Sequence, residues 1–174
     1  MVEQTKKKET QKVADIVASA GGKIVGRTRL QKIGYLLERA GLGDGFEFEY
    51  RHYGPFSDAL ASAAHNAAIL DFIDEEECQA TWGGTYSIFT SRNNPTDAGS
   101  TARQTLAVLA AASDAVELEL AATAAFLSDK GFDDPWAETS RRKPEKASVE
   151  RIARSQQLYA QLSAVKTPIP LPKI

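Results

Sequence analysis

The segment from Arg27 to Leu60 constrains the fold more than any other part of the chain. It begins with apolar residues at helical spacing, namely Leu30, Ile33, Leu37 and Ala40. A glycine-rich turn follows, and residues 46–51 then alternate apolar and charged side chains, as a half-buried strand does. Pro55 comes next and is predicted to open a second helix, where its missing N–H costs nothing. The segment therefore predicts a helix, a short strand and a helix in that order.

A β-hairpin is predicted after the second helix. Residues 79–82 and 85–89 flank Gly83-Gly84, a pair that suits a two-residue hairpin turn. The acidic residues 71–77 are expected to form a link before it. Because helix, short strand, helix and hairpin is the order of a winged-helix domain, we expect a mainly α fold with a minor β component, in which a winged-helix-like N-terminal unit carries the hairpin as its wing.

The second half of the chain is expected to be a helical extension. Residues 106–127 carry apolar side chains at a 3-4 spacing over three heptads, which predicts one long helix whose seam packs within the chain or against a second copy in a homodimer. Asp134-Pro135-Trp136 predicts the start of a short helix, and a last helix is expected at 147–164 with four inner positions, Val149, Ile152, Tyr159 and Leu162. The expected organisation is a flexible N-terminus (1–9), a winged-helix-like domain (10–93), a helical C-terminal extension (98–166) and a proline-rich tail (167–174).

Composition bounds the class of protein. The chain has 174 residues, a formal net charge of -2 and one cysteine, so no intramolecular disulfide is possible and a reducing compartment is the simpler assumption. No apolar run approaches the roughly 20 residues that span a bilayer. The N-terminus also lacks the apolar core of a secretory signal. We therefore expect a cytoplasmic protein without membrane contact.

Catalytic and metal-binding motifs are missing from the sequence. It contains no P-loop, no Gly-x-Ser-x-Gly and no His-Glu-x-x-His, and His52, His65 and Cys78 do not have ligand-like spacing. His52 is interpreted as a core-edge histidine that continues the inner face of the strand. The prediction is a protein that is not an enzyme, with no cofactor, no metal and no catalytic residue.

Nucleic-acid binding would require lysine and arginine side chains on one surface. Two basic groups, near the N-terminus and near residue 142, supply the candidate phosphate contacts: Lys12, Lys23, Arg27, Arg29, Lys32, Arg141, Arg142 and Lys143. The predicted recognition helix does not fit this function, because residues 54–80 contain no lysine or arginine that could contact bases or phosphates.

A small, weakly charged helix face suits a protein partner better. The candidate protein-contact residues lie on the helix after Pro55 and at the tip of the predicted wing: Ser57, Asp58, Ala61, Ser62, His65 and Trp82.

Two blocks of the chain resemble a known group of families. Residues 26–36 are similar to the Leu-Gln-Lys-Leu-x-Tyr-Leu helix of the YwgA-like and Panacea families, and residues 50–57 to their Tyr-Gly-Pro block. The matching positions are Leu30, Gln31, Lys32, Tyr35, Tyr53, Gly54 and Pro55. The short glycine turn between the blocks places the chain nearer the YwgA-like proteins than the SocA-like antitoxins of the Panacea family.

The resemblance implies a bacterial or phage-associated protein that neutralises a toxin by direct contact or acts as a proteolysis adaptor. It supplies no catalytic residues, and its motif positions are either fold determinants or contact residues. We therefore expect a non-enzymatic protein-interaction module, and the alternative is a winged-helix transcriptional regulator that binds DNA.

Overall fold

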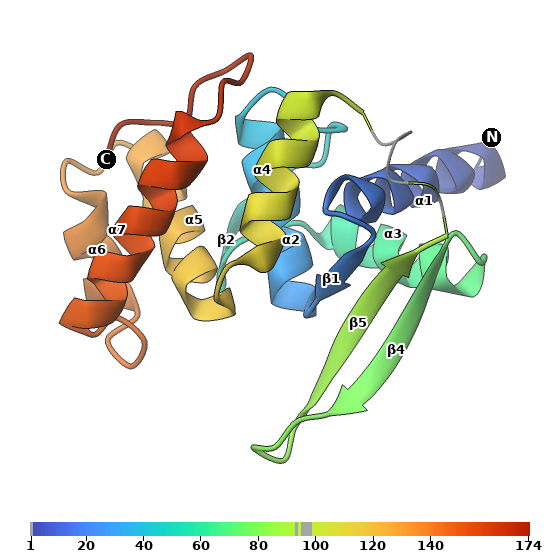
Figure 1. Ribbon diagram of the computed structural model, residues 1–174, viewed down its shortest axis with the longest axis horizontal. Coiled ribbons are helices and arrows are strands. Elements are labelled where there is room, and N and C mark those ends of the chain that lie inside the picture. Colours follow the sequence, from blue (N-terminus) through green and yellow to red (C-terminus); the bar gives the residue numbers. More distant parts are fainter. Residues whose placement is uncertain (1, 93, 95–98) are drawn as a thin grey trace.

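The computed structural model describes residues 2–92, 94 and 99–174, with side chains from Lys8 onward in these ranges (Figure 1). The chain there forms seven helices and five strands: α1 (Val2–Ser19), β1 (Lys23–Val25), α2 (Arg27–Arg39), β2 (Glu49–Arg51), β3 (Gly54–Phe56), α3 (Asp58–Ile69), β4 (Ile73–Gln79), β5 (Thr85–Ser91), α4 (Thr101–Ala112), α5 (Ala115–Asp129), α6 (Pro135–Arg142) and α7 (Val149–Ala164). The expected mainly α fold with a small antiparallel β component is confirmed. No helix in the described ranges has both the length and the apolar character needed to cross a bilayer.

The strands form two small antiparallel sheets. In the first, the order is β1-β5-β4, so that Ile88 of β5 lies between Val25 of β1 and Glu76 of β4. The second contains only β2 and β3. The β4–β5 hairpin extends away from the helices and stands out from the rest of the molecule (Figure 1).

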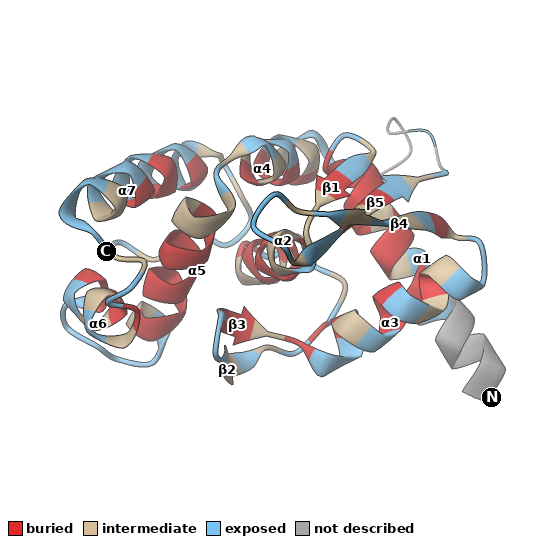
Figure 2. Ribbon diagram, turned by 90° about the horizontal axis from the view of Figure 1, so that it is seen from below, coloured by how far each residue is buried: buried red, intermediate tan, exposed pale blue. Residues whose placement is uncertain are grey.

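Helices α2 and α5 form the centre of the molecule. Residues 30–37 of α2 and residues 118–127 of α5 are all buried (Figure 2). Helix α5 consists largely of alanine and leucine on all its faces, as expected of a helix that other elements surround. One hydrophobic cluster runs from Val13 to Leu171, so the C-terminal helices share their core with the N-terminal elements.

Several local predictions about the first half are wrong. Pro55 lies in strand β3 and not in a helix; α3 starts three residues later at Asp58, because the Ser57 side chain caps it by accepting a hydrogen bond from Leu60 N. The predicted strand at residues 46–51 is shortened to β2. The acidic residues 73–77 belong to β4, and the hairpin loop covers residues 80–84 instead of two glycines.

The predicted long helix at 106–127 is also wrong. It divides into α4 and α5 because Ser113 takes an extended conformation and the Asp114 side chain caps a new helix by accepting from Val116 N and Glu117 N. Val149, predicted to be an inner residue, is 89% exposed at the start of α7. Helix α1 begins at Val2, whereas helical structure was expected from Thr10. The predicted boundary between the two halves falls largely on residues 93 and 95–98, outside the described ranges.

Candidate binding groove

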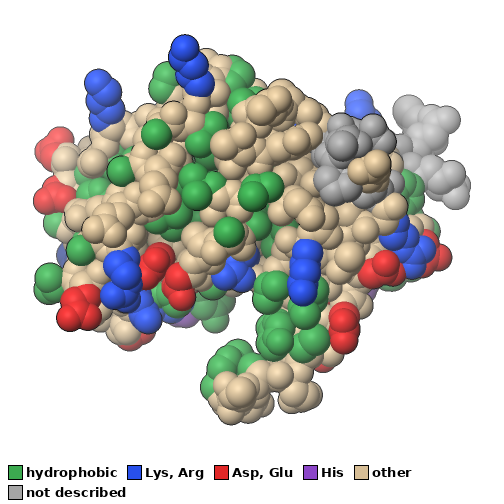
Figure 3. Space-filling view, viewed as in Figure 1, with side chains coloured by type: hydrophobic (Ala, Val, Ile, Leu, Met, Phe, Trp, Pro, Cys, Tyr) green, Lys and Arg blue, Asp and Glu red, His purple; other side chains and the backbone are tan. Residues whose placement is uncertain are grey.

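Two adjoining cavities lie along the side of the β4–β5 hairpin that faces the helices. The first, of about 430 Å³, lies between α2, α3 and the hairpin. The second, of about 570 Å³, lies between β5, the start of α2 and the start of α5. Arg27, Thr28 and Tyr53 line both cavities, which we treat together as one feature, the groove. Figure 3 shows the hairpin standing out from the body, with hydrophobic side chains along its length.

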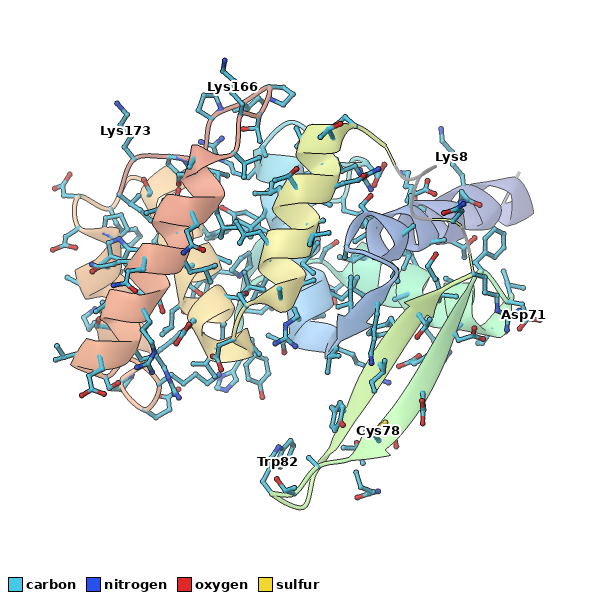
Figure 4. All side chains as sticks on the ribbon, in the orientation of Figure 1. Lys8, Asp71, Cys78, Trp82, Lys166 and Lys173 are labelled. Atoms are coloured by element: carbon cyan, nitrogen blue, oxygen red, sulfur yellow. The ribbon has the colours of Figure 1, made fainter. Side chains whose placement is uncertain are left out.

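Exposed aromatic side chains surround the second cavity. Trp82 is 76% exposed at the tip of the hairpin (Figure 4), and Tyr86 on β5 and Tyr53 on the β2–β3 turn are also exposed. Large aromatic side chains are commonly the residues that carry most of the binding energy in protein–protein interfaces. The groove therefore offers apolar contact area that nothing in the described chain covers.

The groove contains only part of the predicted protein-contact set. Ala61 and His65 of α3 line the first cavity, and Trp82 lines the second. Ser57 is buried as the cap of α3, so its prediction as a contact residue is wrong. Asp58 and Ser62 are exposed on α3 but do not line either cavity.

The two motif blocks of the sequence contact each other directly. Gln31 Nε2 donates to Ser57 O at 3.0 Å, and Gln31 Oε1 accepts from Ser57 N at 2.8 Å. The neighbouring Lys32 Nζ donates to Pro55 O at 2.8 Å. Helix α2 thus holds the Tyr-Gly-Pro turn in place through buried side chains, which gives Gln31, Lys32 and Pro55 a structural role.

The other motif positions also serve the packing. Leu30 and Tyr35 are core residues, and Gly54 approaches Thr123 of α5 so closely that a Cβ atom would lie 2.3 Å from Thr123 Oγ1. Tyr53 is the exception, because its ring is exposed beside the groove.

A buried cluster of charged side chains lies behind the groove. Glu119 of α5 is buried and accepts from Lys143 Nζ at 2.8 Å and, through its other oxygen, from Lys146 Nζ at 2.9 Å. Lys143 also donates to His52 O at 2.8 Å. The Lys146 ammonium lies 4.6 Å from the centre of the Tyr53 ring. Glu119 was not predicted; a signal for it is a glutamate with a leucine on either side, at the start of the alanine- and leucine-rich part of the helix.

Burial lowers the pKa of Lys32 to about 7, because the charged ammonium loses its hydration. The carboxylate of Glu119 opposes this change, and the positive charges of Lys143 and Lys146 add to it. A lysine with a pKa in this range, beside a cavity, marks the groove as a candidate functional site.

The predicted phosphate contacts do not form one surface. Lys32 and Lys143 are buried, and the guanidinium of Arg29 is bound to the carbonyl oxygens of Val25 and Ser113, so these three predictions are wrong. Four of the remaining five are paired with carboxylates: Lys12 with Glu9, Arg27 with Glu75, and both Arg141 and Arg142 with Glu138. Lys23 is exposed on β1.

The interpretation of His52 as a core-edge residue is wrong. It lies exposed on the β2–β3 turn, and its ring packs edge-on against Tyr53 with centroids 4.7 Å apart. Within the described ranges, no three histidine, cysteine, aspartate or glutamate side chains are close enough together to hold a metal ion.

Comparison with protein families, curated proteins and solved structures finds no match to this chain.

Proposed function

We propose that this protein is a non-enzymatic interaction module that binds an extended segment of a partner protein in the groove. The observation that carries the proposal is the set of exposed aromatic side chains, Trp82, Tyr86 and Tyr53, around a pair of joined cavities. Protein-binding sites are enriched in such residues, and exposed aromatic side chains gathered at a cavity favour a binding role.

We further propose that the N-terminal unit is winged-helix-like. Its support is the element order α1-β1-α2-α3-β4-β5 together with the strand order β1-β5-β4, in which the hairpin is the wing. The β2–β3 hairpin is then an insertion between the second and third helices. In this arrangement α3 takes the position of a recognition helix, and its groove-facing residues Ala61, Ala64 and His65 are small or weakly charged.

The resemblance of the two motif blocks favours an antitoxin-like or adaptor-like role for this module. A toxin would then be the bound partner, and the cytoplasm of a bacterium would be the site of action. The alternative is a DNA-binding transcriptional regulator. It has less support, because most of its candidate phosphate contacts are buried or paired with carboxylates.

Partner capture from the lysate of the native host, with and without nuclease, tests the proposal. The full chain should retain a protein that survives nuclease treatment, and that protein, once purified, should bind at least about tenfold more weakly to Trp82→Ala and Ala61→Glu. Val149→Ala is the matched control, because Val149 is an exposed apolar residue that does not line the groove. Equal binding by all variants would overturn the proposal, and retention that nuclease abolishes would favour the DNA-binding regulator.

A further inference from the structure

The groove carries an excess of positive charge on a chain whose formal net charge is -2. Its lysine, arginine, aspartate and glutamate lining consists of four basic residues and three carboxylates: Arg27, Arg29, Lys32, Lys146, Glu75, Glu77 and Glu119. Lys143 adds a further cation directly behind Glu119. A concave surface with a local charge opposite to that of the whole chain favours a ligand of complementary charge.

The carboxylates of the groove do not neutralise its cations one for one. Arg27 and Glu75 form a pair, with Nη2 and Oε1 2.9 Å apart. Glu119, however, is shared by Lys143 and Lys146. Three cations, Lys143, Lys146 and Arg29, therefore stand against two carboxylates, Glu119 and Glu77, which leaves about one positive charge at the second cavity.

Two further groove cations are held by backbone carbonyls. Arg29 Nη2 donates to Ser113 O at 2.8 Å, and Lys32 Nζ donates to Pro55 O at 2.8 Å. Among the described residues, neither cation has a carboxylate within salt-bridge distance. The Nε of Arg29 is buried without a hydrogen-bond partner in this part of the chain. Arg29 keeps its charge with Asp114 as the carboxylate that acts on it, whereas burial lowers the pKa of Lys32 to about 7, so that Lys32 adds only a fraction of a positive charge at neutral pH.

We infer that the partner segment bound in the groove is acidic, with an aspartate or glutamate side chain against Lys146 and apolar neighbours against Trp82 and Tyr86. The inference rests on the proposed function and adds the chemical class of the segment. A peptide fits better than a nucleic acid, because the aromatic and aliphatic lining of the same cavities needs apolar side chains to cover it.

Selection of random linear peptides displayed on phage against the full chain tests this inference. The enriched peptides should share an aspartate or glutamate beside an aromatic or aliphatic residue. A synthetic, fluorescently labelled copy of one enriched peptide should bind more weakly as salt is added. Its affinity should fall about three- to tenfold when its acidic residue is replaced by the corresponding amide.

Variants of the chain locate the acidic residue. Lys146→Gln should weaken binding of the acidic peptide about three- to tenfold and should remove most of the difference between the acidic peptide and its amide copy. Arg27→Gln lowers the net charge of the groove at an exposed residue without disturbing the buried cluster. It should weaken binding of the acidic peptide less than Lys146→Gln does, because Arg27 is already paired with Glu75. Lys166→Gln is the control, because Lys166 is an exposed lysine after α7 that does not line the groove (Figure 4).

The possible failures are distinguishable. Neutral or basic peptides that lose their binding with Trp82→Ala would overturn the acidic partner and leave the proposed function standing. An absence of enriched peptides, or peptides that bind Trp82→Ala as well as the natural chain, would overturn both. Displacement of the acidic peptide by mixed-sequence duplex DNA at low salt would show that the positive charge of the groove binds phosphate groups, and it would overturn the inference.

Discussion

Gln31 and Ser57 are joined by two hydrogen bonds, one in each direction, between the side-chain amide of Gln31 and the backbone of Ser57. Both residues are buried, and Ser57 also caps α3. A single side chain thus fixes the position at which the third helix begins relative to α2. The groove depends on this contact, because its first cavity lies between these two helices.

The first prediction concerns this contact. Gln31→Ala should lower the free energy of unfolding by about 2–4 kcal/mol, because both hydrogen bonds are lost and the N–H and C=O of Ser57 remain buried. The measurement is urea unfolding followed by circular dichroism. Gln11→Ala is the control, since Gln11 is exposed and bonds only Asp15 on its own helix; it should cost less than about 0.5 kcal/mol. Similar costs for the two variants would contradict the structural role of Gln31.

The second prediction concerns the close approach of Gly54 to α5. Gly54→Ala should destabilise the fold by about 2–4 kcal/mol, because its φ of 85° is strained for alanine and the new Cβ would lie 2.3 Å from Thr123 Oγ1. Gly131→Ala has a similar φ of 89° but no atom within 4 Å of the new Cβ, so it should cost about 1 kcal/mol. Thermal unfolding of both variants separates crowding from backbone strain. Addition of Thr123→Ala should recover part of the stability of the Gly54 variant only.

The third prediction concerns the shared carboxylate. Glu119→Gln should destabilise the protein by about 3–5 kcal/mol, because it leaves Lys143 and Lys146 near one another without their common counter-charge. Glu117→Gln on the same helix removes an ion pair with Arg154 at the surface, and it should cost less than about 1 kcal/mol. Denaturant unfolding of the two glutamate variants measures both losses of stability. Equal losses would show that Glu119 does not stabilise the protein through Lys143 and Lys146.

The fourth prediction concerns the pH dependence of stability. The pKa of Lys32 is about 7 in the folded chain, whereas the ordinary pKa of a lysine, which applies to the unfolded chain, is 10.5. Between pH 7 and pH 10.5 the folded state therefore binds fewer protons than the unfolded state. Burial of the charged Lys32 therefore lowers the free energy of unfolding by its full amount below pH 7, and this loss of stability shrinks as pH rises toward 10.5. Lys32→Met removes this titration.

The measurement for Lys32 is the difference in unfolding free energy between the natural chain and Lys32→Met. This difference should grow in favour of the natural chain by up to about 1.4 kcal/mol per pH unit above pH 7. A difference that stays constant with pH would show that Lys32 keeps its ordinary pKa in the folded protein.

Regular local patterns were sufficient to predict many elements. The apolar periodicity of residues 30–40 predicted α2, Asp134-Pro135-Trp136 predicted the start of α6, and the residues around Gly83-Gly84 predicted a hairpin. These signals succeeded because helix caps, turn glycines and one-sided apolar spacing act over a few neighbouring residues. The same reasoning failed at Pro55, which lies in a strand because the helix begins only after the Ser57 cap, and at Ser113, where the Asp114 cap divides the predicted long helix.

For the candidate site, the sequence identified Trp82, Ala61 and His65 as exposed, weakly charged contact residues, and all three line the groove. It did not reveal which basic residues are free to bind a ligand. Lys143 is buried because its ammonium reaches both Glu119 and the carbonyl of His52, which lies 91 positions away in the chain. Whether a lysine is solvated, paired or held by a carbonyl depends on segments that are distant in sequence. Local residue patterns carry no information about these contacts, so the charge of the groove emerges only when α2, α5 and the β2–β3 turn are packed together.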